Sequence, residues 1–187
     1  MDRLPMSSPP LPGRVLVEQH WRDLVFLHWR VAPERVERYL PEGTRPDVID
    51  GATWVGLIPF VLADTRFPPL PALHRLGTFV EVNVRLYARD DLGRRGVVFR
   101  TLEAGRLLPV IAARAAFGLP YHWARASVVR RVDAAGLELE FRSRRHGPHG
   151  PSTRIRARLG EPVPGATFLR CPRTLAEAPA VKLIQLG

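Results

Sequence analysis

The sequence lacks the features that mark several common classes of protein. It has one cysteine, Cys171, so no disulfide can form within the chain, which agrees with a reducing compartment. No apolar run is long enough to span a membrane, because proline or charged residues break the longest candidates. The first residues, MDRLPMSSPPLPGR, lack the apolar middle of a secretory signal. These absences predict a cytoplasmic protein with no membrane partner.

Lysine is almost absent as well. Lys182 is the only one, and nearly all of the net charge of +10 comes from arginine. A basic balance suggests nucleic acid or an acidic ligand as partner. We prefer the alternative, a coding bias for arginine, because the arginines are interleaved with Asp and Glu up to about residue 140. The concentrated basic patch is RSRRHGPHGPSTRIRAR, residues 142–158. A nucleic-acid-associated protein using this patch is therefore a less favoured alternative.

Motifs of common catalytic and cofactor sites are also missing. The chain has no Gly-x-Ser-x-Gly elbow and no Gly-rich phosphate loop. His146 and His149 form a loop pair in HGPHG, but no cysteine or carboxylate cluster accompanies them. His28 lies on an expected strand, where a histidine is more often a core residue than a metal ligand. We therefore predict no metal and no cofactor.

What the sequence does contain is enough for one sizeable domain. It has 187 residues, of which 45% are hydrophobic and 25% charged, as in ordinary globular proteins. Residues 1–13 are rich in proline and serine, and we expect them to be flexible. Residues 14–187 are expected to form a single domain whose tail is atypical from about residue 161.

Hydrophobic periodicity predicts many strands and few helices. Two segments are typical of helices, 32–43 and 106–120, the second stopped by Gly118 and Pro120. An Asp50-Gly51 pair between apolar runs predicts a hairpin turn. Strands are expected at 24–31, 79–91, 97–105, 121–133, 137–145 and 153–160. Sequential hairpins of this kind favour an α+β fold that is mostly β, an antiparallel barrel or sandwich with short helices.

The strand FVEVNVRLYARDD, residues 79–91, has two different faces. Its valines alternate with a set that points the other way and includes Glu81, Asn83 and Arg85. If the second face meets water, these are ordinary surface residues. If it faces the inside of a barrel, they form the polar wall of a pocket.

Four segments resemble the YqjF-like family of uncharacterised bacterial proteins: FLHWRVAPERVERYLPEG, DGATWVGLIPF, FVEVNVRLYA and AARAAFGLPYHWA. The resemblance runs from about Gln19 to Leu159. That family is related to the acetoacetate decarboxylase-like fold, a mixed β-barrel with a central pocket. The resemblance therefore implies an antiparallel β-barrel closed by short helices, with the Glu81 face lining its pocket.

The resemblance to the decarboxylases extends to particular residues. Arg22 in RDLVFLHWR takes the place of a pocket arginine, and Glu81 in TFVEVNV that of a functional glutamate. In ARAAFGLPYH, Arg114 matches a further arginine. Tyr121 falls where the Schiff-base lysine would be, and His122 falls where its neighbouring lysine would be.

The replacement of the lysine bears directly on mechanism. Tyrosine and histidine cannot form the imine that a Schiff-base reaction requires, and Lys182 lies outside the matched region. We therefore do not expect acetoacetate to be decarboxylated by that route. Whether the protein is an enzyme is left open; if so, we expect lyase-like or acid–base chemistry on a small keto acid.

The favoured function is binding of a small acidic or carbonyl-bearing molecule in the barrel. The candidate catalytic residues are Glu81, Tyr121 and His122, and the candidate ligand-binding residues are Arg22, Asn83, Arg85 and Arg114. Two alternatives stay open: a non-enzymatic sensor or carrier, and a Glu–Arg network that only holds the barrel together. For Tyr121 and His122, a pocket-lining tyrosine beside a surface histidine is preferred to an acid–base pair.

The sequence departs from its relatives after Gly160. There it reads EPVPGATFLRCPRTLAEAPAVKLIQLG, whereas relatives continue with a Leu-Thr-Glu-Arg-Tyr-like segment and more chain. The chain is either truncated or frameshifted relative to the family, or the tail is a variant. If strands are missing, a homodimer could cover the exposed sheet edge.

Overall fold

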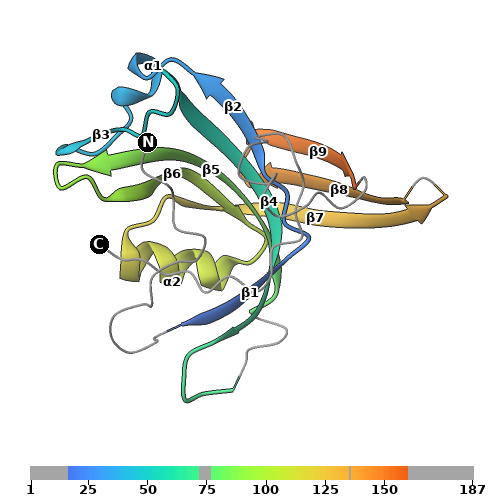
Figure 1. Ribbon diagram of the computed structural model, residues 1–187. Helices are drawn as coiled ribbons and strands as arrows, with labels where there is room; N and C mark the ends of the chain where they lie inside the picture. Colours follow the sequence, from blue (N-terminus) through green and yellow to red (C-terminus); the bar gives the residue numbers. More distant parts are fainter. Residues whose placement is uncertain (1–16, 72–76, 135, 160–187) are drawn as a thin grey trace.

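A computed structural model describes residues 17–71, 77–134 and 136–159, which form one nine-stranded sheet and two helices (Figure 1). The helices are α1 (Glu34–Glu37) and α2 (Leu107–Phe117). The strands are β1 (Glu18–Arg22), β2 (Leu27–Val31), β3 (Thr44–Pro46), β4 (Thr53–Arg66), β5 (Phe79–Asp90), β6 (Arg95–Ala104), β7 (Tyr121–Asp133), β8 (Gly136–Arg145) and β9 (Ser152–Arg158). The predictions for residues 1–13 and for the tail from about 161 fall outside the described residues.

The strand order is β1-β4-β5-β6-β7-β8-β9, with β2 also paired to β4 and β3 to β5. All pairs are antiparallel except β6 and β7, which are parallel and are joined through α2, because a parallel pair needs a crossover connection. The mostly antiparallel β fold predicted from the sequence is confirmed. In the described part of the chain the sheet runs open from β1 to β9, so closure into a barrel is not confirmed.

Local turn chemistry explains where several elements begin and end. Asp50 and Gly51 both have positive φ, 51° and 74°, and the flanking residues Ile49 and Ala52 hydrogen-bond to each other in both directions. This confirms the two-residue turn predicted from the Asp-Gly pair. Helix α2 ends at Gly118, whose φ of 62° is the left-handed conformation that glycine adopts at helix ends.

Two elements are shorter than their sequence pattern predicts. The helix expected over 32–43 is a single turn, α1, with Pro33 at its N-cap. The strand expected from Leu24 begins at Leu27. The missing residues are buried all the same, because Leu24 and Val25 point into the two separate cores of the protein. Among the described residues no helix is long and apolar enough to cross a membrane.

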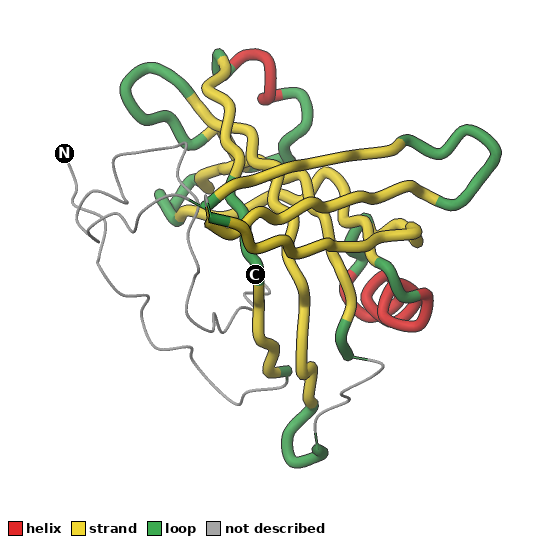
Figure 2. The backbone as a smooth tube through the Cα atoms, turned by 90° about the vertical axis from the view of Figure 1, so that its right-hand side faces the viewer, coloured by secondary structure: helices red, strands yellow, loops and turns green. Residues whose placement is uncertain are grey.

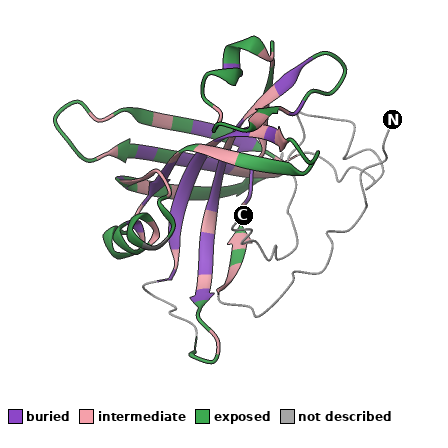
Figure 3. Cartoon of the chain, turned by 90° about the vertical axis from the view of Figure 1, so that its left-hand side faces the viewer, coloured by how far each residue is buried: buried purple, intermediate pink, exposed green. Residues whose placement is uncertain are grey.

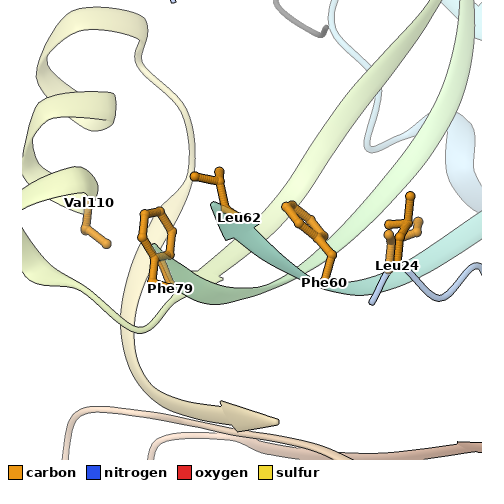
Figure 4. Packing of buried hydrophobic residues seen from close by; sticks show 7 residues of the cluster. Leu24, Phe60, Leu62, Phe79 and Val110 are labelled. Atoms are coloured by element: carbon orange, nitrogen blue, oxygen red, sulfur yellow. The ribbon is translucent and has the colours of Figure 1, made fainter. Parts of the chain in front are cut away.

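The middle of the sheet is buried on both faces, as the purple strands of Figure 3 show. On one face, residues of β4 and β5 pack against α2 to form the first core (Figure 4): Leu24, Ile58, Phe60, Leu62, Phe79, Ala104 and Val110. On the other face, valines of β5 pack against β8 and β9 to form the second core: Val25, Val80, Val82, Leu139, Phe141, Ile155 and Ala157. Figure 2 shows strands running in two crossing directions. The sheet is strongly twisted, so its last strands, β8 and β9, pack across β5 and form the second core.

Candidate functional site

Strand β5 keeps the alternation predicted from its sequence. Val80 and Val82 lie in the second core, whereas Phe79 lies in the first core beneath α2. Glu81, Asn83 and Arg85 follow Phe79 on the same face and are only 2%, 1% and 7% exposed. The polar face of this strand is therefore inside the protein and does not meet bulk water.

Glu81 is the central residue of this buried polar cluster. Its cross-strand neighbours are apolar, Phe60 on β4 and Ala104 on β6. The Tyr121 hydroxyl, from the first residue of β7, donates a hydrogen bond of 2.8 Å to Glu81 Oε2. Asn83 Nδ2 donates a longer one, of 3.5 Å, to Oε1. The carboxyl group thus has polar partners inside an otherwise apolar part of the core.

Burial dominates the electrostatics of this carboxyl group. It raises the pKa of Glu81 to about 7, although hydrogen bonds from Tyr121 and Asn83 and the charge of Arg85 act in the opposite direction. Burial also raises the pKa of Tyr121, with the nearby Glu81 charge as the second cause. Glu81 can therefore gain or lose a proton near neutral pH while the tyrosine stays protonated.

Arg85 carries donors that the described residues do not satisfy. Its Nε and Nη2 atoms are buried without a hydrogen-bond partner, and so is Oδ1 of Asn83. The guanidinium carbon lies over the Phe26 ring, 5.5 Å from its centre. Burial lowers the pKa of Arg85, and the charges of Tyr87 and Glu81 oppose this effect. An unmet buried donor costs about 1–3 kcal/mol, so this edge is suited to an acceptor from outside the chain.

A histidine and a tyrosine extend the cluster beyond Arg85. Nε2 of His28 on β2 and the hydroxyl of Tyr87 on β5 share a hydrogen bond of 2.6 Å. Burial lowers the pKa of His28, and the positive charge of Arg85 lowers it further. His28 is therefore a half-buried, partnered side chain close to the arginine, and it belongs to neither core.

Gly56 creates the space for this arrangement. It lies opposite Arg85 in the β4–β5 register. A Cβ at this position would lie 3.2 Å from Arg85 Cγ, 3.3 Å from His28 Nε2 and 2.8 Å from Ile58 Cδ1. No side chain fits here unless its neighbours move.

Replacing Gly56 with alanine is therefore expected to displace Arg85 and His28 and to destabilise the protein by about 1–3 kcal/mol. Urea unfolding measures the stability, and a histidine NMR titration reports the displacement through the pKa of His28. Gly96→Ala is the matched control, because an added Cβ on this β6 glycine meets nothing within 4 Å. Equal stability of the two variants would show that the site tolerates the methyl group.

Arg22, expected to lie beside Glu81, is not part of the cluster. Its side chain is 60% exposed and forms an ion pair with Asp64. The preceding residue, Trp21, stacks on Phe60 and so lies on the Glu81 side of the sheet. Successive strand residues point to opposite faces, so Arg22 points away from Glu81.

Arg114 also lies outside the buried cluster. It is exposed on α2, where it lines an open hollow of about 460 Å³ together with Leu107, Val110, Ile111, Ala115 and Trp123. Its position on a helix that covers the first core explains why it does not reach the polar side chains of β5.

His122 faces the opposite way from Tyr121, because the two are consecutive on β7. It lies opposite Glu103 in the β6–β7 register. Glu103 accepts hydrogen bonds from Ser143 Oγ at 2.5 Å and from Arg145 Nε at 2.8 Å. Burial lowers the pKa of His122, followed by the charges of Arg145 and Arg114. His122 therefore lies beside Glu103 and not beside Glu81 and Tyr121.

The sequence-based site missed Tyr87, Phe26 and Gly56. Tyr87 could have been found, since it continues the alternation of Glu81 and Arg85 along the strand. Phe26 and Gly56 gave no signal, because their contacts with Arg85 depend on how distant strands pair.

The described part of the chain has the acetoacetate decarboxylase-like fold, as its similarity to solved structures shows. Acetoacetate decarboxylase from Legionella pneumophila superposes with a TM-score of 0.53 at 14% identity, over 75% of this chain and 50% of that one. An acetoacetate decarboxylase-like enzyme from Sphingomonas wittichii RW1 gives 0.54 at 17%, over 71% and 54%. The enduracididine biosynthesis enzyme MppR, complexed with pyruvate, gives 0.56 at 16%, over 83% and 60%. Likeness at these identities establishes the fold alone.

The chain belongs to the DUF2071 family, described as uncharacterized conserved proteins, whose family model matches residues 18–177. The uncharacterized protein YqjF of Bacillus subtilis (strain 168) is 32% identical over 134 residues, which are 71% of this chain and 55% of that protein. The chain thus spans about half the length of this relative.

Proposed function

We propose that the buried cluster on β5 binds a small molecule bearing a carboxylate or carbonyl group, held by Arg85. The observation that carries this proposal is the pair of buried, unpartnered donors Nε and Nη2 on that guanidinium. These two atoms lie along one edge of a planar fork, the geometry that grips a carboxylate with two parallel hydrogen bonds.

The neighbouring groups narrow the class of ligand. Asn83 Oδ1 is a buried acceptor without a partner, so a hydroxyl or N–H on the ligand would satisfy it. Glu81, with a pKa of about 7, can donate or accept a proton at neutral pH. MppR, which shares the fold, is complexed with pyruvate, a carboxylate next to a carbonyl. Together these features favour a small keto or hydroxy acid.

Calorimetry with pyruvate and acetoacetate tests the role of Arg85. Arg85→Lys keeps the charge but loses the fork, so affinity should fall about tenfold or more, because hydrogen bonds to charged groups contribute about 1.5–3 kcal/mol. Arg22→Lys and Arg114→Lys are matched controls that should bind as the wild type does. If either control binds more weakly while Arg85→Lys binds with wild-type affinity, the proposal is contradicted, and the ligand is held by Arg22 or Arg114, as the family resemblance implies.

Any reaction at this site is expected to be acid–base chemistry centred on Glu81, not imine formation. The family resemblance puts Tyr121 where the Schiff-base lysine would be, and the described residues include no lysine. Borohydride reduction in the presence of acetoacetate should therefore leave the mass of the Tyr121 peptide unchanged. An added mass on that peptide would contradict the proposal, whereas an adduct confined to Lys182 would be nonspecific modification. Turnover of a keto-acid panel separates an enzyme from a carrier or sensor.

A further inference from the structure

Strands β7, β8 and β9 present a strongly basic outer surface, here called the basic face. The face that points away from the second core carries seven arginines, two glutamates and one aspartate: Arg125, Arg131, Asp133, Glu138, Glu140, Arg142, Arg144, Arg154, Arg156 and Arg158. Four positive charges are thus in excess on one side of a three-stranded sheet. Coding bias accounts for a high arginine content, but the alternation of the strands gathers these arginines on one face.

Four of these arginines converge on one carboxylate. Glu140 accepts hydrogen bonds from Arg131, Arg142, Arg154 and Arg156 at distances between 2.6 and 3.2 Å. They cover it so well that its side chain is 1% exposed, while their own side chains remain 53–58% exposed. The Arg142 hydrogen bond is the main cause that lowers the pKa of Glu140 to about 2. One carboxylate neutralises one charge, so this cluster keeps an excess of exposed donors.

At one end of the basic face, two neighbouring pairs of residues face each other across β7 and β8: a pair of arginines and a pair of aromatic rings. Arg125 and Arg144 lie directly opposite each other, and neither has an ion-pair partner among the described residues. Like charges in this position are unfavourable on their own. The neighbouring pair is Trp123 and His146, whose rings stack with centroids 3.8 Å apart, and Trp123 is 42% exposed.

We propose that the basic face binds single-stranded nucleic acid, with Arg125 and Arg144 on successive phosphates and Trp123 stacking on a base. Guanidinium groups hold phosphate oxygens through paired hydrogen bonds. An exposed aromatic ring next to a basic track is the combination that holds single strands without reading sequence. An extended strand face matches an extended polynucleotide, and the ligand would neutralise the opposed Arg125–Arg144 pair.

Fluorescence anisotropy with a labelled mixed-sequence DNA single strand, at about 50 and about 200 mM salt, tests this proposal. The wild type should bind and should lose affinity as salt increases. The double variant Arg125→Ser/Arg144→Ser should bind about tenfold or more weakly, and its slope of log affinity against log salt should be smaller by about 1.4, since each contact to a single strand contributes about 0.7. Neither arginine contacts Glu140, so the ion cluster that covers this carboxylate is retained.

Two further variants separate this proposal from simple charge attraction. Arg35→Ser/Arg45→Ser removes the same charge from exposed positions on or beside α1 and β3 and should leave binding nearly unchanged. Trp123→Ala should weaken binding with an unaltered salt slope, because stacking releases no counterions. The proposal is overturned if the wild type does not bind the single strand, if both double variants weaken it equally, or if Trp123→Ala binds like the wild type. Preference for heparin or for anionic vesicles over the single strand would also overturn it.

Discussion

Replacing Glu81 with glutamine is expected to stabilise the protein at alkaline pH by about 3 kcal/mol more than at acid pH. The wild-type carboxyl must ionise inside an apolar core, and its pKa is raised from 4.5 to about 7. Each pKa unit corresponds to about 1.4 kcal/mol, so ionising the buried group costs about 3 kcal/mol. Glutamine has nearly the same shape but does not ionise, so this cost is absent in the variant.

The direction of the pH dependence follows from which state holds the proton. Between pH 4.5 and about 7 the folded protein keeps Glu81 protonated while the unfolded chain releases the proton. Stability therefore falls as the pH rises through this window and levels off above it. His28 acts in the opposite direction, because its lowered pKa makes acid destabilising below its usual value of 6.5. Both proteins contain His28, so the difference between them isolates Glu81.

Urea unfolding of wild type and Glu81→Gln at several pH values between about 4.5 and 8 measures this difference. Glu34→Gln, on the exposed side of α1, is the matched control and should show a constant small difference. If the difference in unfolding free energy between wild type and Glu81→Gln is also the same at every pH, water reaches this carboxyl group in the folded protein.

The strands and their faces were largely predictable because they depend on local pattern. The alternation of β5 correctly separated the valines from Glu81, Asn83 and Arg85, and β7 begins and ends where its sequence pattern does. These features arise from side-chain direction along one strand, which needs no knowledge of the rest of the chain.

The sequence predicted only some of the residues that form the site, and the physical reason differs from one residue to the next. Tyr121 does lie beside Glu81, as the family resemblance implies. Its neighbour His122 does not, and the alternation of β7 could have excluded it. Arg22 was misplaced because its face is set by how β1 pairs with β4, a contact between residues about 40 positions apart that leaves no trace in local sequence.

The basic face shows the same division between local and long-range information. The period-2 pattern of β8 and β9 puts Glu138 and Glu140 on the same face as the arginines of β9, and Arg156 pairs with Glu140 and Arg158 with Glu138. The convergence of four arginines on Glu140 depends on strand pairing, because one of the four is Arg131 from β7. Composition alone gives the charge, whereas strand register determines where that charge is concentrated.

Replacing Phe60 with alanine is expected to destabilise the protein by about 3–5 kcal/mol at acid pH. Phe60 is fully buried, stacks on Trp21 with ring centroids 4.4 Å apart and is the cross-strand neighbour of Glu81. Removing the ring leaves a cavity beside the carboxyl group, and water or relaxed side chains there would make ionisation of Glu81 easier. The loss of stability should therefore be smaller at alkaline pH, where wild-type Glu81 is ionised at a cost.

A second phenylalanine and a double variant make this coupling measurable. Phe141 is also fully buried but lies in the second core, on the other side of the sheet from Glu81, so Phe141→Ala should lose the same stability at all pH values. Phe60→Ala combined with Glu81→Gln should likewise show a loss without pH dependence, since the titrating group is gone. Phe60→Leu, which leaves a smaller cavity, provides the same comparison where the alanine variant does not fold. If the Phe60 and Phe141 variants respond identically to pH, the Phe60 ring is not what keeps water from Glu81, and its desolvation must arise from Ala104 and the covering helix α2.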